Sequence, residues 1–192
     1  MHPAFSVIFF TVTSGAGYGL MALLCLFNFL YLGMLFDKNI FLIFSGISAV
    51  LFTMGLISST FHLANPKNAW RAFMRFRTSW LAREGLLAIL FYPTLFLYLL
   101  LIHLDFYKDY FLLMQIYSVF IFFFAILIIY CTGMIYACLK TIPQWNTPWT
   151  PINYITIGIY LGGLMFFALL SLNDFNIDPY KPFVLALIFV AF

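Results

Sequence analysis

Long stretches without a charged residue restrict the fold of this chain more than any other feature. The first charged side chain is Asp37, and Asp, Glu, Lys and Arg together make up only 8% of the 192 residues. Domains that fold in water carry about 25% charged residues, so a chain that is 65% hydrophobic cannot cover itself with a polar surface. This composition excludes a water-soluble domain, makes a nucleic-acid partner implausible and predicts a protein embedded in membrane lipid.

The charge-free stretches also locate the membrane-spanning helices, because about 20 apolar residues cross a bilayer as an α-helix. Five complete spans are predicted, over residues 5–36, 40–63, 79–103, 110–139 and 152–172. A sixth apolar stretch begins after Pro182 and would reach only about 16 Å, about half the thickness of the hydrocarbon layer. We therefore expect an all-α integral membrane helix bundle. It would form a single transmembrane domain over residues 1–192, with a truncated sixth helix and an incomplete C-terminus.

Basic residues gather on one side of the predicted bundle. The connections after the second and fourth spans, with the helix start that follows, contain Lys67, Arg71, Arg75, Arg77, Arg83 and Lys140. The other side has three lysines mixed with five aspartates. Because cytoplasmic loops of membrane proteins carry an excess of Lys and Arg, the basic side and the N-terminus are predicted to face the cytoplasm.

The connection over residues 65–80 combines this charge with aromatic side chains. Trp70, Phe73 and Met74 follow the i, i+3, i+4 spacing of one helical face. The pattern predicts an amphipathic turn or short helix at the membrane surface. Charge complementarity steers and orients protein docking. We therefore expect the basic residues of this segment to bind a partner subunit: Lys67, Arg71, Arg75 and Arg77.

Histidine and cysteine are the residues that would hold a haem or an iron–sulfur cluster. His62 ends the second predicted span on the basic side, whereas His103 ends the third on the other side, about 28 Å away along a helix. These imidazoles cannot ligate one haem. Cys25, Cys131 and Cys138 lack the spacing of a metal site and are predicted to be small packing residues. We expect no haem, no iron–sulfur cluster and no metal site in this chain.

Three candidate site residues come to the basic side from adjacent helix ends. They are His62, Arg83 and Glu84. Glu84 is predicted about one turn inside the third span if Ser79 or Thr78 caps that helix, and a carboxylate at this depth is costly unless it is paired.

The Glu84 carboxylate has two interpretations. It could form a structural ion pair with Arg83, Arg77 or Arg75. Alternatively, Glu84 and His62 could relay protons while a quinone headgroup is reduced or a quinol is oxidised. His62 could also be no more than a polar residue at a helix end.

A glycine-rich run in the first span has a structural explanation. Residues 14–19 resemble a nucleotide-binding loop only superficially, because no strand precedes them and no Lys or acidic residue follows at a useful spacing. Gly15 and Gly19 form a GxxxG pattern, which favours close helix packing and leaves a face that could admit a flat ring. Gly162 and Gly163 in the fifth span have the same interpretation.

Four segments of the chain together carry a family resemblance. They are residues 2–5 (HPAF), 59–73 (STFHLANPKNAWRAF), 77–85 (RTSWLAREG) and 136–143 (YACLKTIP). They resemble the DmsC family, the membrane anchor subunits of dimethyl sulfoxide reductase-type molybdoenzymes, which includes sulfite dehydrogenase anchor subunits. The resemblance covers most of the chain and is most specific over residues 59–84.

The resemblance implies an eight-helix fold without haem in the bacterial inner membrane. Members of the family hold a four-cluster iron–sulfur subunit and a molybdopterin catalytic subunit at one membrane face, and exchange electrons with menaquinone or ubiquinone. The family's quinol-site residues are a histidine that ends the second helix and a glutamate that begins the third, which match His62 and Glu84. The basic-side charge fits the branch that resembles the cytoplasmic sulfite dehydrogenase anchor better than the exported dimethyl sulfoxide reductases.

Three functions compete at this point. The first is a quinone-reactive anchor that passes electrons between quinone and an iron–sulfur subunit, with all redox centres in other subunits. The second is a small transporter or channel with a proton-coupled gate at Glu84 and His62. Transporters tend to have interrupted helices and inverted repeats, and neither is evident in this sequence. The third is a structural anchor without a quinone site.

Overall fold

The computed structural model describes residues 5–30, 37–61, 70, 74–173 and 183. Within these ranges the chain is helical and has no strand. The elements are α1 (Phe5–Leu30), α2 (Lys38–Thr60), α3 (Trp80–His103), the 3₁₀ helix η2 (Phe106–Lys108), α4 (Phe111–Ala137) and α5 (Trp149–Leu172). All five α-helices are long and apolar enough to cross a membrane. This confirms the five predicted spans, while the expected sixth lies almost entirely outside the described residues and stays a prediction.

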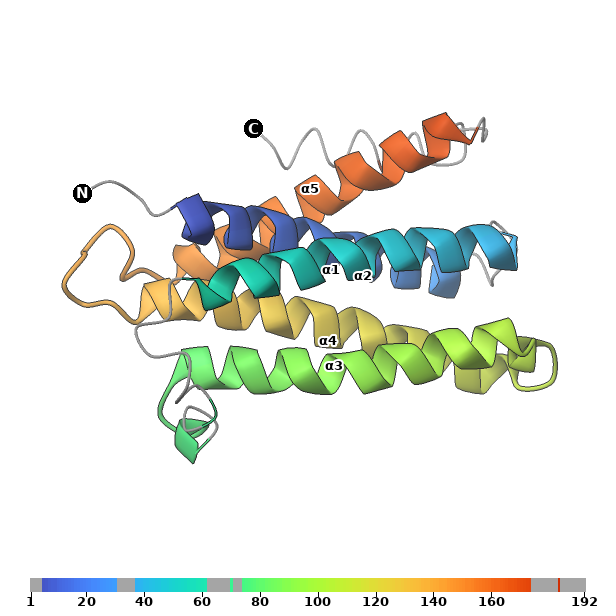
Figure 1. Ribbon diagram of the computed structural model, residues 1–192, viewed down its shortest axis with the longest axis horizontal. Helices are drawn as coiled ribbons and strands as arrows, with labels where there is room; N and C mark the ends of the chain where they lie inside the picture. Colours follow the sequence, from blue (N-terminus) through green and yellow to red (C-terminus); the bar gives the residue numbers. More distant parts are fainter. Residues whose placement is uncertain (1–4, 31–36, 62–69, 71–73, 174–182, 184–192) are drawn as a thin grey trace.

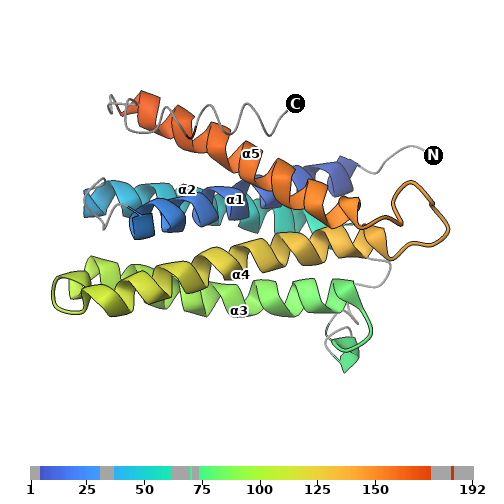
Figure 2. The same ribbon diagram turned by 180° about the vertical axis from the view of Figure 1, so that it is seen from behind.

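The helices run alternately up and down along one long axis (Figure 1). The starts of α1, α3 and α5 therefore lie at the same end as the last turns of α2 and α4, which the view from behind also shows (Figure 2). We name this the basic end, because the connections there carry Arg75, Arg77 and Lys140. The predicted placement of the connections after the second and fourth spans on one side is confirmed for their described residues.

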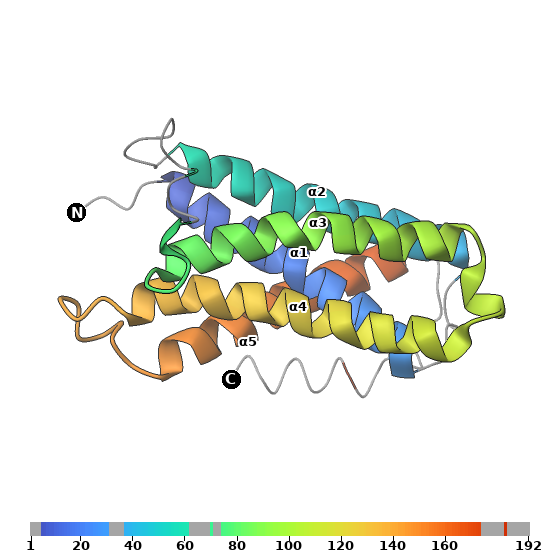
Figure 3. The same cartoon turned by 90° about the horizontal axis from the view of Figure 1, so that it is seen from below.

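The first helix is the centre of the bundle. α1 packs against α2, α4 and α5, and it crosses the other helices diagonally (Figure 3). Nearly all of its residues from Ala16 to Cys25 are buried, including Leu20, Met21 and Leu24. The outer helices instead keep large apolar side chains exposed, as lipid-facing surfaces do in a membrane bundle.

Glycines make the contact between α1 and α5. A Cβ atom on Gly19 would lie 1.9 Å from the Gly158 carbonyl oxygen, and one on Gly162 would lie 2.3 Å from the Gly19 carbonyl carbon. No side chain fits between backbones this close, so α1 and α5 can cross here only because Gly19 and Gly162 lack side chains. The prediction of close packing is confirmed for Gly19 and Gly162, whereas a Cβ on Gly15 would be in ordinary contact, 3.8 Å from the Gly158 Cα atom.

Two details differ from the sequence-based expectation. The fifth span was predicted to begin at residue 152, but α5 already begins at Trp149. Pro151 is tolerated there because the first turn of a helix has no backbone hydrogen bond for proline to remove. Cys25 and Cys131 are buried as predicted, whereas Cys138 is exposed at the end of α4, so its assignment as a packing residue is wrong.

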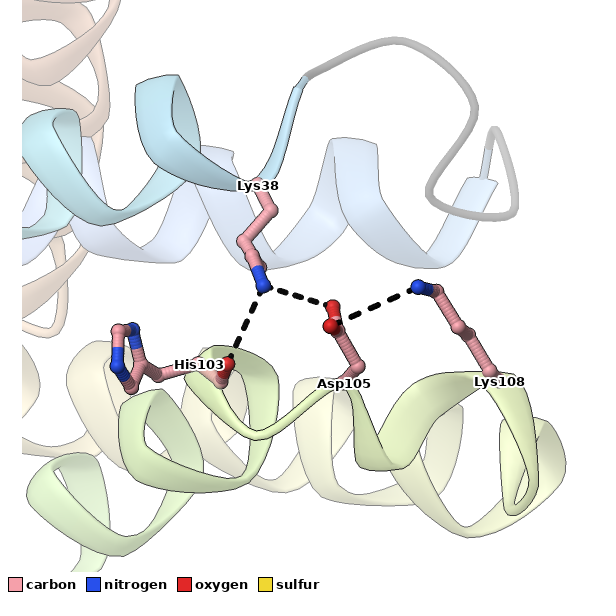
Figure 4. A network of polar contacts seen from close by, with 4 residues as sticks. All are labelled: Lys38, His103, Asp105 and Lys108. Atoms are coloured by element: carbon pink, nitrogen blue, oxygen red, sulfur yellow. Dashed lines mark hydrogen bonds and ion pairs between the residues drawn. The ribbon is translucent and has the colours of Figure 1, made fainter.

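The end opposite the basic end is fastened by exposed charges. The Nζ atom of Lys38 at the start of α2 lies 2.9 Å from Asp105 and donates to the backbone oxygen of His103 at 3.3 Å (Figure 4). Lys108 lies 3.5 Å from the other Asp105 oxygen. The hydrogen bond from Lys38 holds the pKa of the Asp105 carboxyl below its usual value. Asp105 also has a left-handed backbone (φ 59°), which Asp and Asn tolerate better than most residues.

Candidate functional site

The Glu84 side chain points into the bundle near the basic end. The Ser79 side chain caps α3 by accepting from the Ala82 backbone nitrogen at 3.4 Å, as predicted, so Glu84 lies just past the first helical turn. The residue is only 4% exposed. It continues a buried stripe of α3 whose other members follow at intervals of three or four residues: Ala88, Phe91, Leu95, Tyr98 and Ile102.

A matching stripe on α4 supplies the partner of Glu84. Its members are Met114, Ser118, Ile121, Ala125, Ile128 and Thr132. The Thr132 hydroxyl donates to the Glu84 carboxylate and also lies 3.2 Å from the Ile128 backbone oxygen. Glu84 and Thr132 thus form a polar layer at the basic end of a mostly apolar seam between α3 and α4.

The ion-pair interpretation of Glu84 finds no support in the part of the chain that the structure describes. The ion pairs recorded there join Asp105 to lysines at the other end. Arg83, one position from Glu84, turns outward and donates to the backbone oxygens of Phe76 at 3.0 Å and Arg77 at 2.7 Å. Its guanidinium lies 4.1 Å above the Trp80 ring. Arg83 therefore fastens the preceding loop to α3.

A cavity of about 240 Å³ opens between α1, α4 and α5 beside this layer. Its walls are Thr11, Val12, Ser14, Gly15, Tyr18, Ile129, Thr132, Tyr154, Ile157, Gly158 and Leu161. Gly15 and Gly158 line the cavity where α1 and α5 cross, so no side chain fills this part of its wall. Thr132 belongs both to this wall and to the hydrogen bond with Glu84, whereas Glu84 itself does not line the cavity.

The hydroxyl groups of the cavity wall differ in what they can offer a ligand. Ser14 donates to the Phe10 oxygen at 2.6 Å and Thr11 to the Ile8 oxygen at 3.0 Å, so both oxygens remain available as acceptors. The Tyr18 hydroxyl is buried and has no hydrogen-bond partner among the described residues. Buried hydroxyls normally have a partner, so an unpaired one beside a cavity is available to a bound molecule.

The structure describes some of the remaining predicted site residues but not all of them. Arg75 and Arg77 are exposed at the basic end, next to the exposed apolar side chains of Met74 and Phe76. His62, Lys67 and Arg71 lie outside the described residues.

Sequence reasoning found Glu84 and a glycine face that could admit a flat ring, and Gly15 of that face lines the cavity, but it missed Thr132 and the other cavity walls. A threonine in an apolar span commonly bonds to its own helix backbone, so Thr132 alone gives no signal. The available signal was the spacing: extending the apolar stripes of α3 and α4 by one step reaches Glu84 on one helix and Thr132 on the other.

These features define the class of protein to which the chain belongs. The chain is a multi-pass membrane protein whose helices enclose a buried carboxylate and a partly polar cavity near one membrane face. The sequence profile of the DMSO reductase anchor subunit (DmsC) family matches residues 1–191, and the chain belongs to that family. This confirms the resemblance seen in the sequence.

The chain is also similar to a protein with a known name. The chain is 32% identical over 180 residues to a sulfite dehydrogenase subunit from Allochromatium vinosum. The match covers 86% of this chain and 54% of the relative, so the chain spans about half the length of that protein. No solved structure matches the chain.

Proposed function

We propose that this chain is a quinone-reactive membrane anchor subunit of a molybdopterin oxidoreductase complex. It would pass electrons between menaquinone or ubiquinone and an iron–sulfur subunit, which in turn serves the molybdopterin catalytic subunit. The observation that carries the proposal is the buried Glu84 carboxylate, joined through Thr132 to a cavity between membrane-spanning helices. Membership of an anchor-subunit family supports this function over a proton-coupled transporter.

The cavity fits a quinone headgroup. A bound quinone supplies two-electron, two-proton redox chemistry. The volume of about 240 Å³ lies just below the range of about 300–1,000 Å³ typical of sites for drug-sized ligands, which suits a ring without its lipid tail. The wall combines apolar side chains with the glycine surface and with hydroxyls that can bind ring oxygens.

Glu84 is the proposed proton acceptor of the site. An ionised carboxylate inside a membrane bundle is costly, and one that persists without an ion pair indicates a functional demand for its position. His62 is proposed as the second proton-handling group near the basic end. Arg83 belongs to the proposed site as a positioning residue, because it ties the loop before α3 to the helix that carries Glu84.

The basic end is the proposed docking surface for the iron–sulfur subunit. Arg75 and Arg77 are exposed there beside Met74 and Phe76, a mixture of charge and apolar area that suits a protein interface. Lys67 and Arg71 are proposed to extend this surface. The excess of basic residues supports a cytoplasmic position for this end, and with it for the N-terminus, in a bacterial inner membrane.

The similarity to a sulfite dehydrogenase subunit favours a second form of the proposal. In it, the same quinone site would accept electrons from a cytoplasmic sulfite-oxidising enzyme instead of donating them to a dimethyl sulfoxide reductase. The proton chemistry at Glu84 is the same in both directions, because a group that accepts protons from quinol returns them to quinone.

The direct test compares two activities of the purified complex. Glu84→Gln should slow quinone-linked turnover by about 10²-fold, since general acid–base groups contribute about 10²–10⁴-fold. Turnover of the catalytic subunit with an artificial dye should stay intact. Asp105→Asn, which removes a carboxylate at the opposite end, is the matched control and should leave both activities unchanged. Unchanged quinone-linked turnover in Glu84→Gln would contradict the proposed site.

Docking is tested by charge reversal. Arg75→Glu combined with Arg77→Glu should release the iron–sulfur and catalytic subunits into the soluble fraction. Lys108→Glu reverses a charge at the opposite end and should leave them bound. Partner subunits that remain with the membrane in the double variant would place the docking surface elsewhere.

A further inference from the structure

Glu84 is separated from the cavity by one side chain. The cavity wall contains Thr132 but not Glu84, and the Thr132 hydroxyl donates to the carboxylate behind it. A molecule in the cavity therefore meets the Thr132 oxygen first. Any proton that passes between this molecule and Glu84 by the shortest described route has to cross that hydroxyl.

The surroundings of Thr132 suit such a transfer. A threonine hydroxyl carries one hydrogen, yet two acceptors lie within reach: a Glu84 carboxylate oxygen and the Ile128 backbone oxygen at 3.2 Å. When Glu84 is ionised, Thr132 donates to it. When Glu84 is protonated, Glu84 can donate to Thr132 and the threonine hydrogen can turn to Ile128. The hydrogen bonds of Glu84 and Thr132 are then made in both protonation states of Glu84, and no helix has to move.

We propose that Thr132 is the proton relay between a quinone ring in the cavity and Glu84. The inference rests on the proposed function and adds the place of the ring and the residue that connects it to the carboxylate. During quinol oxidation, a ring hydroxyl gives its proton to the Thr132 oxygen while the threonine hydrogen passes to Glu84. The two electrons leave for the iron–sulfur subunit. The second proton follows the same route after Glu84 has released the first to the basic end.

A pair of conservative variants tests the relay in the assembled complex. Thr132→Val keeps the shape of the side chain but has no hydroxyl, whereas Thr132→Ser keeps the hydroxyl. We expect Thr132→Val to lower kcat with menadiol or menadione by about 10²-fold. Its KM, and the menadione affinity measured by titration calorimetry, should stay near the wild-type values. Thr132→Ser should restore most of the turnover.

The place of the ring is tested independently by filling the cavity. Val12 lines the cavity and is 46% exposed, so Val12→Trp should occupy the space at little cost to folding and abolish menadione binding. Val50 on α2 is 58% exposed and does not line the cavity, so Val50→Trp is the matched control and should bind menadione normally.

The outcomes separate the inference from the proposed function. Wild-type kcat in Thr132→Val would overturn the relay, and wild-type menadione affinity in Val12→Trp would overturn the place of the ring. Equal loss of kcat in Thr132→Ser and Thr132→Val would also overturn the relay, because the hydroxyl would then not be the group that matters. If the wild-type complex shows no quinone-linked turnover, the proposed function itself fails.

Discussion

The two ends of the helix bundle handle their carboxylates in opposite ways. At the end far from the basic connections, Asp105 is exposed, carries two lysine partners and holds a turn between helices. Near the basic end, Glu84 is buried and its described partner is a single neutral hydroxyl. Exposed ion pairs are inexpensive, whereas a buried carboxylate without a cation is costly. The comparison supports the proposal that Asp105 stabilises the fold whereas Glu84 belongs to the quinone site.

The largest expected effect on stability comes from variants that disrupt the crossing of α1 and α5, which shapes the cavity near the basic end. Gly19→Ala and Gly162→Ala would each place a Cβ within 2.3 Å of backbone atoms on the facing helix. Overpacking costs about 1–3 kcal/mol even where side chains can adjust, and backbone atoms adjust less. Thermal unfolding in detergent should show a much lower Tm for both variants.

Gly46→Ala is the matched control for this prediction. A Cβ on Gly46 meets no atom within 4 Å, and alanine is the better helix former, so its Tm should be unchanged or slightly higher. If Gly19→Ala melts like Gly46→Ala, the close crossing of α1 and α5 is not present in the protein.

The next largest effect is the opposite response of stability and turnover when each of the two carboxylates, Glu84 and Asp105, is replaced. Glu84→Leu removes a costly buried carboxylate and leaves no cation unpaired, and Thr132 can still donate to the Ile128 backbone oxygen, so the variant should not lower Tm although it removes quinone-linked turnover. Asp105→Asn should do the reverse, with a slightly lower Tm and unchanged turnover. A marked loss of stability in Glu84→Leu would mean that Glu84 is a structural residue.

The smallest effect is a pH dependence at the opposite end. Because Lys38 holds the pKa of folded Asp105 below its usual value, this carboxylate stabilises the fold above the ordinary carboxyl range. The contribution is lost as pH falls through the lowered pKa. The small Tm difference between the wild type and Asp105→Asn should therefore be present near neutral pH and vanish in acid. Asn keeps the left-handed backbone accessible, so the variant isolates the charge. A Tm difference that persists in acid would assign the effect to something other than the ion pair.

The sequence predicted those parts of the fold that depend on local or periodic patterns. Charge-free length indicated five spans, Ser79 indicated the start of α3, and the Gly15–Gly19 spacing indicated a close helix contact. Each of these signals lies within a single helix or its cap. The start of α5 was placed three residues too late, at residue 152 directly after Pro151, although the first turn of a helix accepts proline.

The candidate site was harder to predict because it depends on four helices at once. The sequence singled out Glu84 because a carboxylate inside a membrane is energetically costly. It did not show the direction of the Glu84 side chain or its hydrogen-bond partner. Thr132 is 48 residues away and becomes a neighbour only when the stripes of α3 and α4 face each other. The cavity adds α1 and α5, and the Gly15–Gly19 spacing indicates a close contact without showing which helix lies on the other side.

The central claim is that Glu84 takes up a proton when quinol is oxidised at this site. Infrared difference spectroscopy on the assembled complex can observe this directly, because a carboxyl group that gains a proton gains a carbonyl stretching band. Oxidation of bound menadiol should produce this band in the wild type, and the band should be absent in Glu84→Gln but present in Asp105→Asn. A band that persists unchanged in Glu84→Gln, or that never forms in a wild-type complex active with quinol, would contradict the account.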